Sequence, residues 1–410
     1  MRDPQEHADR LAYLQLQNKQ GFKYWSKRWG VNGPSVLSVP KFDVTKCILH
    51  DPMHVILEGI AKVELKAALK VFIYQKNYFT LEFLNKAIQQ YSFSAVEMKD
   101  KPEVIDRHAL EPKAVFPQTA AAMKTLLLNF PYIVGDEIAD DDEHWQNFLR
   151  LLQILILSIT PVISVYTPVT LETLVATHNK TFIELYSEDL FTPKFHYLVH
   201  LPQQMRLFGP LRHHWCMRFE SKNGFFKLQR WFNYRNLPKS LSFYHQNWMC
   251  LQMIQTSGCR STVYLYSGDQ VSEGVGVAVD SLPGANAVLE RDFGQEQVPA
   301  CVMCSKRVLI NGLLYQNGTV LLLSMDDHDI QFVEVQSIIV HEQAKYLYCH
   351  RLNVIFFDSH RNAFRVQRSE SVSVIKVTHL QYMWPQVVHH HGHRYYVTLQ
   401  NADDVWASNA

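Results

Sequence analysis

The sequence lacks an apolar run long enough to cross a membrane. Its longest apolar stretch, residues 148–166, is interrupted by Arg150, Gln153 and Pro161. A spanning helix needs about 20 predominantly apolar residues, so this stretch favours a buried helix. The N-terminus is charged and has no apolar core of a secretion signal. We therefore expect a protein that is neither secreted nor inserted in a membrane and that resides in the nucleus or the cytoplasm.

The sequence also lacks an excess of either charge and a framework of cysteines. There are 40 Lys and Arg against 39 Asp and Glu, so a surface that binds nucleic acid must be local. The seven cysteines are scattered, which is typical of a reducing compartment. Hydrophobic residues make up 47% of the 410 residues, which excludes a disordered chain and allows two or three domains.

Several enzyme motifs are missing as well. We find no glycine-rich phosphate loop, no GxSxG nucleophile elbow and no convincing Cys/His nucleophile pair. Cys301 and Cys304 form a lone CxxC, whereas a structural zinc site needs four ligands. Cys349 and His350 would have to supply the others. Two thiols in a loop at a strand edge is the competing interpretation.

Other groups of titratable residues have simple structural interpretations. His196 and His200 are four residues apart, a spacing that can bind a metal, but no HExxH pattern accompanies them. The histidines of residues 389–393 surround Gly392 and indicate a turn between strands. Residues 140–143 are four consecutive acids, which favour a helix N-terminus because they complement the helix dipole.

The periodicity of apolar residues divides the chain into two parts. A three-to-four spacing predicts helices at residues 58–75, 81–91, 119–130, 145–159, 171–190, 215–232 and 237–254. A period of two predicts strands at residues 332–340, 345–349, 353–357, 373–377 and 395–399. Residues 308–315 and 319–323 flank Asn317-Gly318, which indicates a hairpin.

The predicted fold is therefore α+β, with a mainly helical N-terminal region followed by a small antiparallel β-barrel-like domain. The expected division is an irregular N-terminal segment (1–50), a helical region (51–256), a linker and extended segment (257–300) and an antiparallel β domain (301–410).

Residues 204–239 combine cations and aromatic rings. They contain eight Lys and Arg, eight aromatic residues and a single acid, Glu220. Cations neutralise phosphates and rings stack on bases, so this stretch is a candidate nucleic-acid surface. Its candidate contacts are Arg212, Arg218, Lys222, Lys227, Arg230 and Arg235. The competing interpretation is a solvated basic helix in which Glu220 pairs with Lys222 or Lys227.

Asp51 and His54 are a second candidate pair. Asp51 is a favoured N-cap residue and Pro52 suits the first position of a helix, so a capping role explains both. In the competing interpretation, Asp51 and His54 lie on one helical face, where they bind a metal or brace the fold.

Three stretches of the chain together resemble DDE transposases of large eukaryotic cut-and-paste elements. They are WGVNGPSVL at residues 29–37, DPMHVILEG at 51–59, and PKFHYLVH at 193–200 with its continuation to MRFESK at 217–222. The most similar groups are the CACTA (En/Spm-like) and Kyakuja–Dileera–Zisupton transposases, over residues 20–250. The resemblance implies an RNase H-like core that is interrupted by a helical insertion. Asp51 and His54 match the Asp/Cys-x-x-His signature of the insertion, and Glu220 matches the third Mg²⁺-binding catalytic carboxylate.

The chain departs from this family upstream of Asp51. The first two catalytic aspartates belong there, on strands, but only about 50 residues precede Asp51. Two-metal chemistry needs at least two carboxylates, so Glu220 is expected to be vestigial and the polypeptide not to cleave or join DNA by itself. We expect no cofactor, and a transposon-derived, nuclear protein with DNA as its candidate partner. The alternatives are an interaction module, in which the β domain binds a protein or a second copy, and a non-functional remnant.

Overall fold

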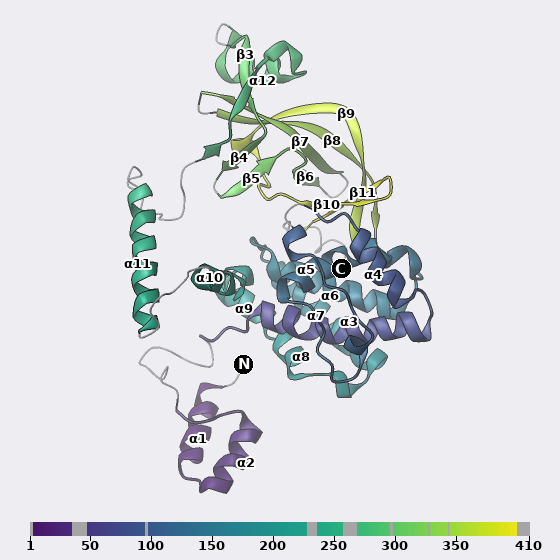
Figure 1. The fold of residues 1–410 in the computed structure, drawn as a ribbon, viewed down its shortest axis with the longest axis vertical. Coiled ribbons are helices and arrows are strands. Elements are labelled where there is room, and N and C mark those ends of the chain that lie inside the picture. Colours follow the sequence, from purple (N-terminus) through teal and green to yellow (C-terminus); the bar gives the residue numbers. More distant parts are fainter. Residues whose placement is uncertain are drawn as a thin grey trace.

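In a computed structural model the chain is an α+β protein, in which helices come first and antiparallel strands follow (Figure 1). The structure describes residues 3–34, 47–94, 97–227, 236–256, 269–295, 298–310, 312–326, 329–342 and 344–399. The predicted fold class is confirmed at this level. Within these ranges, no helix is both long and apolar enough to cross a membrane.

The N-terminal segment, which we expected to be irregular, contains two helices. These are α1 (Pro4–Gln15) and α2 (Lys19–Trp29). Each helix begins at a capping side chain: Asp3 accepts from the backbone N–H of Glu6, and Asn18 from that of Gly21. Helix α2 ends at Gly30 in the left-handed conformation, with φ of 65°. Capping side chains therefore define the starts of these two helices, although their sequences show little apolar periodicity.

The helical region begins with a continuous helical run from Met53 to Gln75. Its middle is α3 (Ala61–Lys70), and its two ends, η1 (Met53–Ile60) and η2 (Val71–Gln75), have the wider π-helical geometry. The remaining helices are α4 (Leu81–Gln90), α5 (Ala120–Val134), α6 (Glu143–Ile159), α7 (Thr167–Tyr186), α8 (Pro193–Leu198), α9 (Leu201–Phe208), α10 (Met217–Lys227) and α11 (Leu237–Thr256). Short 3₁₀ turns connect them at Met98–Asp100, His108–Leu110, Gly135–Glu137, Glu188–Leu190 and Leu211–His213.

The helical predictions agree with the structure within a few residues for α4 to α7. The acidic run at residues 140–143 opens α6 as expected, because the Asp142 carboxylate accepts from the Trp145 backbone N–H at 2.9 Å. One large apolar core joins η1, α3, α5, α6, α7 and the short helices that follow. Trp145 is fully buried at its centre, against Phe72, Phe130 and Phe148.

The C-terminal part is built from antiparallel strands. They are β1 (Gln270–Val271), β2 (Gly274–Ala278), β3 (Cys301–Ser305), β4 (Arg307–Ile310), β5 (Leu313–Gln316), β6 (Val320–Asp326), β7 (Asp329–His341), β8 (Ala344–Asp358), β9 (Ala363–Lys376), β10 (Val387–His391) and β11 (Arg394–Thr398). One sheet has the order β10-β11-β9-β8-β7-β3-β2, with β6 also paired to β7, and a smaller one has the order β1-β4-β5. The 3₁₀ turns Val279–Ser281 and Val377–His379 and helix α12 (Ala285–Phe293) complete this part.

The expected linker at residues 257–300 contributes to this sheet. Strand β2 pairs with β3 over its whole length, and α12 packs its buried residues Ala285 and Leu289 on the same apolar cluster as Tyr346. The linker expectation can therefore apply only to its first part, and residues 257–268 lie outside the described residues.

The predicted hairpin at Asn317-Gly318 is wrong. The hairpin forms one turn earlier, where β4 and β5 pair with Ile310 opposite Leu313, and Gly312 has φ of 78°. Gly318 also has a positive φ of 82°, but the strand after it, β6, pairs with β7 and not with β5. Two Asn-Gly dipeptides have the same local signal, and only strand pairing selects between them.

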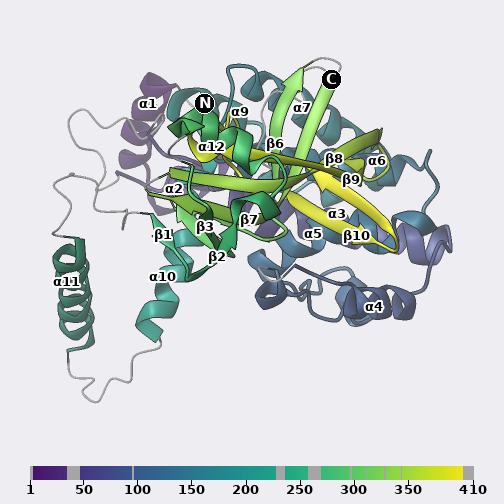
Figure 2. The same cartoon turned by 90° about the horizontal axis from the view of Figure 1, so that it is seen from above.

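Two predicted strands, residues 345–349 and 353–357, are a single strand of 15 residues, β8. Its ladders with β7 and β9 contain register shifts, such as the one between His350 and Leu352. Such bulges bend and twist a long strand, so the sheet curls. In the view from above, β7, β8 and β9 cross over the helical region (Figure 2).

The sheet is joined to the helices by polar side chains at β10, β11 and the turn before β9. The Arg361 guanidinium pairs with Asp136 and, at 3.0 Å, with Asp358. His391 lies 2.5 Å from Asp136, and the buried Tyr132 hydroxyl bonds Thr398 at 2.8 Å. The predicted turn between strands is present at Gly392 and His393, with Gly392 at φ of 58°, whereas His389, His390 and His391 belong to strand β10 and pair with β11.

His389 makes this junction sensitive to acid. Its ring is buried, stacks on Tyr132 at 4.0 Å and contacts Asn129. Burial, and then the charge of His390, lower the pKa of His389 from 6.5 to about 3. Below pH 6.5 the unfolded chain binds a proton that the native state does not, so stability falls as the pH falls. The contribution lost between pH 7 and pH 5 is about 2 kcal/mol.

We therefore expect His389→Phe to lose less stability than the wild type between these pH values. The phenyl ring keeps the stack on Tyr132 but cannot titrate. Urea unfolding at pH 7 and pH 5 measures the difference, and His108→Ala is the control because its side chain is 76% exposed. An equal pH dependence in His389→Phe and the wild type would contradict this origin.

Candidate functional site

The two stretches that carry the Asp51 and Glu220 signatures meet in the structure. Asp51 precedes η1, and the Asp51 carboxylate accepts from the Cys216 backbone N–H at 3.1 Å, across 165 residues of sequence. The same carboxylate contacts the Nδ1 atom of His54. The Nε2 atom of His54 lies 3.8 Å from Oε1 of Glu220 on α10. The imidazole of His54 thus lies between two carboxylates, one from each end of the helical region.

Local structure explains the position of Asp51 and His54. Asp51 accepts from the backbone N–H of Met53 at 3.2 Å, and its carbonyl accepts from Val55, so it caps the run as the sequence predicted. π-helical segments are rare and are frequently found at functional sites. The widened turn is braced at Gly59, where the Lys194 side chain crosses so closely that a Cβ atom would lie 2.2 Å from it.

Lys194 belongs to the third signature stretch, and it also satisfies the backbone of η1. Its ammonium group donates to the Glu58 carbonyl at 2.8 Å. Burial lowers the pKa of Lys194, the charge of Glu58 opposes this, and Lys62 adds to it. A Cβ atom at position 59 would therefore force the Lys194 side chain to move away from η1.

The surroundings of the Cys216 thiol oppose its ionisation. Burial raises the pKa of its thiol, and the charge of Asp51, a hydrogen bond to Asp51 and the charge of Glu220 raise it further. Nucleophilic cysteines need a lowered pKa, because the thiolate is the reactive form. Burial and the two carboxylates thus oppose the thiolate that a Cys-His-Asp hydrolase triad requires, although the residue types match such a triad.

A metal ion fits these residues better. One donor atom each from Asp51, His54 and Cys216 lie within 4.8 Å of one another, the sole such group of three or more ligands among the described residues. Sequence reasoning identified Asp51, His54 and Glu220 but missed Cys216. The signal was present, since Cys216 precedes Glu220 by four residues, which is one helical turn.

Three histidines form a separate group beside this site. His50 stacks on His200 at 5.2 Å, and the Nε2 atoms of His196 and His200 are 3.2 Å apart. The side chain of Gln204 bonds both the backbone and the ring of His50. Burial, and then the charges of His196 and His50, lower the pKa of His200 to about 4. His196 and His200 do not lie on one continuous helix, because α8 ends at Leu198 and α9 begins at Leu201.

The basic stretch is divided between exposed and covered cations. Arg212, Arg218 and Lys227 are exposed. The Lys222 ammonium instead lies 3.5 Å from the ring centroid of Trp248 on α11 and 4.0 Å from that of Phe225. The expected contacts Arg230 and Arg235 lie outside the described residues.

Helices α10 and α11 are joined mainly by aromatic rings. Phe225 contacts Tyr244 and Trp248 at 5.0 and 5.5 Å between ring centroids, whereas Phe219 is 69% exposed. In Figure 1 the two helices extend from the side of the helical region. This arrangement presents the cations of α10 to solvent.

Cys301 and Cys304 are not part of a ligand group within the described residues. They lie in β3 and not in a loop, with Cys301 exposed and Cys304 half-buried. Their proposed partner Cys349 is buried in β8, where burial raises its thiol pKa to about 12. The geometry gives no support to a zinc site at this CxxC.

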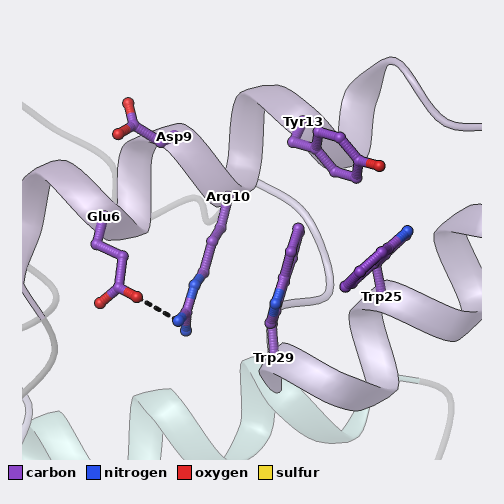
Figure 3. A pocket seen from close by; sticks show the side chains of 6 residues that line it. All are labelled: Glu6, Asp9, Arg10, Tyr13, Trp25 and Trp29. Atoms are coloured by element: carbon purple, nitrogen blue, oxygen red, sulfur yellow. Dashed lines mark hydrogen bonds and ion pairs between the residues drawn. The ribbon is translucent and has the colours of Figure 1, made fainter.

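A surface pocket of about 380 Å³ lies between α1 and α2 (Figure 3). Its lining residues are Glu6, Asp9, Arg10, Tyr13, Trp25 and Trp29. Arg10 pairs with Glu6 and lies 5.6 Å from the Trp29 ring centroid, so these charged and aromatic groups satisfy one another. We assign no ligand to it.

No protein-family model, no curated protein and no solved structure matches this chain. Its function must therefore be inferred from the residues described above.

Proposed function

We propose that the chain derives from a DDE transposase and comprises its helical insertion and the helix that carries the last catalytic carboxylate. On this proposal the protein is catalytically incomplete and keeps a nucleic-acid-binding surface at α10. The β-rich part that follows would be an appended domain. A nuclear location would follow from DNA as the partner.

The approach of His54 to Glu220, at 3.8 Å, is the observation that carries the proposal. The resemblance places a signature at the start of an insertion and a carboxylate after its end. These stretches are separated by more than 160 residues, and nothing local requires them to meet. Their convergence, with Lys194 of the third stretch against η1, is the arrangement expected if one ancestral site had been assembled from them.

Binding without cleavage is the activity that the described residues support best. Strand transfer by two metal ions needs several carboxylates that converge on ions roughly 3.5–4 Å apart. The described residues gather no group of three carboxylates, and the Asp51 carboxylate accepts from the chain's own N–H groups. The cations Arg212, Arg218 and Lys227, by contrast, face solvent.

Reversing the three candidate contacts that are exposed in the described residues is expected to abolish DNA binding. The variant carries Arg212→Glu, Arg218→Glu and Lys227→Glu. The wild type should bind duplex DNA with an affinity that falls steeply as salt rises, because phosphate contacts release counterions. Each lost contact should reduce the slope of log affinity against log salt by about 1. Fluorescence anisotropy over a salt series measures both quantities, and a Mg²⁺-dependent strand-transfer assay on the same protein should be negative.

The matched control reverses three other exposed cations of the helical region, Lys86, Arg107 and Lys180. The control changes the net charge of the protein by the same amount as the first variant. The two variants therefore differ only in where on the surface the charges are reversed. An equal loss in the control, or binding that ignores salt, would argue against a surface at α10.

A protein partner is the second candidate, and one observation favours it. Near its end β8 exposes three consecutive large apolar side chains, with Ile355 at 49%, Phe356 at 45% and Phe357 at 37%. Exposed apolar residues in contiguous patches mark interaction surfaces. A protein partner is favoured over DNA if neither added salt nor reversal of the three cations changes DNA binding.

A further inference from the structure

The side chains around Asp51 offer donor atoms of three kinds. They are a carboxylate oxygen, an imidazole nitrogen and a thiol sulfur, and one of each lies within 4.8 Å of the other two. Zinc accepts all three kinds at about 2.0–2.3 Å, whereas Mg²⁺ prefers oxygen ligands. We propose that Asp51, His54 and Cys216 form a zinc-binding site.

The ligands are held together before any ion binds. His54 lies in the first turn of η1, Asp51 caps that turn, and Cys216 immediately precedes α10. The backbone N–H of Cys216 donates to Asp51 at 3.1 Å, which joins the two elements. This hydrogen bond fixes the two backbone segments from which the three donor atoms approach one another within 4.8 Å. The His54 side chain is 52% exposed, so an ion can reach it from solvent.

Glu220 supplies the fourth ligand. A zinc ion is usually bound by four ligands in a tetrahedron. The Glu220 backbone N–H donates to the Cys216 carbonyl at 2.9 Å, so Glu220 on α10 follows Cys216 by one helical turn. Oε1 of Glu220 lies 3.8 Å from Nε2 of His54. The complete set is then one aspartate, one histidine, one cysteine and one glutamate.

Zinc would also change the protonation of the site. Metal-bound cysteine is a thiolate, so the proton of Cys216 must leave to solvent as the ion binds. Zinc affinity should therefore rise with pH.

This inference does not rest on the proposed function. The candidate phosphate-binding side chains Arg212, Arg218 and Lys227 contribute no donor to the site, so DNA binding and metal binding can fail separately. Zinc would stabilise the junction between η1 and α10 whether or not the chain binds nucleic acid.

Cobalt(II) spectroscopy on the full chain tests the site, because cobalt replaces zinc and reports its ligands. After removal of metal with a chelator, the wild type should bind one Co²⁺ per chain. It should show a sulfur-to-cobalt charge-transfer band and the visible bands of a tetrahedral site, and Zn²⁺ should abolish both. Cys216→Ser should lose the charge-transfer band. Cys304→Ser, the matched half-buried thiol of the CxxC, should keep it.

His54→Asn separates ligation from folding, because the His54 side chain is half-exposed and tolerates replacement. It should keep the charge-transfer band and weaken Co²⁺ binding more than roughly 10-fold. The proposal is overturned if the wild type shows no such band, if Cys216→Ser keeps it, or if His54→Asn binds Co²⁺ as the wild type does. The charge-reversed variant at α10 should keep the band, which distinguishes failure of this site from failure of DNA binding.

Discussion

Replacement of Glu64 by alanine is expected to destabilise the protein by about 2–6 kcal/mol, because it removes the partner of two buried groups, Nε2 of His178 and the side-chain amide of Asn147, each of which costs about 1–3 kcal/mol when unsatisfied. Glu64 and His178 are both fully buried, and Oε2 of Glu64 lies 2.6 Å from Nε2 of His178. The other carboxylate oxygen accepts from the side-chain amide of Asn147 at 3.0 Å. The three polar groups join α3, α6 and α7 inside an otherwise apolar core.

Urea unfolding followed by circular dichroism measures this loss. Glu64→Gln keeps the size and one hydrogen-bonding oxygen, so it should be less damaging than Glu64→Ala. Glu172→Ala is the matched surface control, since Glu172 pairs with Arg206 on side chains that are 61% and 41% exposed. Exposed pairs contribute roughly 0–1 kcal/mol. Equal losses in Glu64→Ala and Glu172→Ala would show that the buried network is unimportant.

The second large effect is expected at Trp145, where alanine should cost about 3–5 kcal/mol because it leaves a cavity in the core. The indole is fully buried against Phe148 at 5.3 Å between ring centroids. Its Nε1–H donates to the His360 carbonyl at 3.1 Å, in the turn between β8 and β9. Trp145 therefore belongs both to the helical core and to the junction with the sheet.

Trp145→Phe separates the packing of the aromatic ring in the core from its hydrogen bond to the His360 carbonyl. It keeps an aromatic ring but leaves the buried His360 carbonyl unsatisfied, which should cost about 1–3 kcal/mol. Trp248→Ala is the control, because that indole is 37% exposed on α11. Thermal unfolding measures the series. The expectation fails if Trp248→Ala is as destabilising as Trp145→Ala, or if Trp145→Phe matches the wild type.

The two proposals give different roles to neighbouring parts of one element. In Met217–Lys227, Glu220 faces His54, whereas Arg218 and Lys227 are exposed. A zinc ion at Asp51, His54 and Cys216 would anchor the start of α10 to η1. An anchored α10 would present its cations in a defined orientation, so metal binding would support DNA binding even though neither requires the other.

Several features of the chain were predictable from sequence because their causes are local. The capping roles of Asp51 and Asp142 act within three residues, and the apolar spacing identifies α4 to α7 within a few residues. The Gly392 turn follows from the residues that surround it. Capping and periodicity need no knowledge of the rest of the fold, so a single sequence contains them.

The candidate site was only partly predictable. Asp51, His54 and Glu220 were identified by residue type and by resemblance, but Cys216 was not, because its contact with Asp51 spans 165 residues. The hairpin error has the same origin. Gly312 and Gly318 have equivalent positive φ values, and their sequence neighbours do not reveal that β6 pairs with β7.

The sequence by itself determined the positions of helices α4 to α7 to within a few residues, the capping role of Asp51 and the presence of one unusually basic stretch. Only the tertiary structure decided that Asp51 meets Cys216, that Glu64 meets His178 and that Trp145 reaches His360. The physical reason is how far apart in the sequence the contacting residues lie. Hydrogen bonds at caps and turns connect residues a few positions apart, whereas these contacts depend on how complete helices and sheets pack, to which every apolar residue of the core contributes.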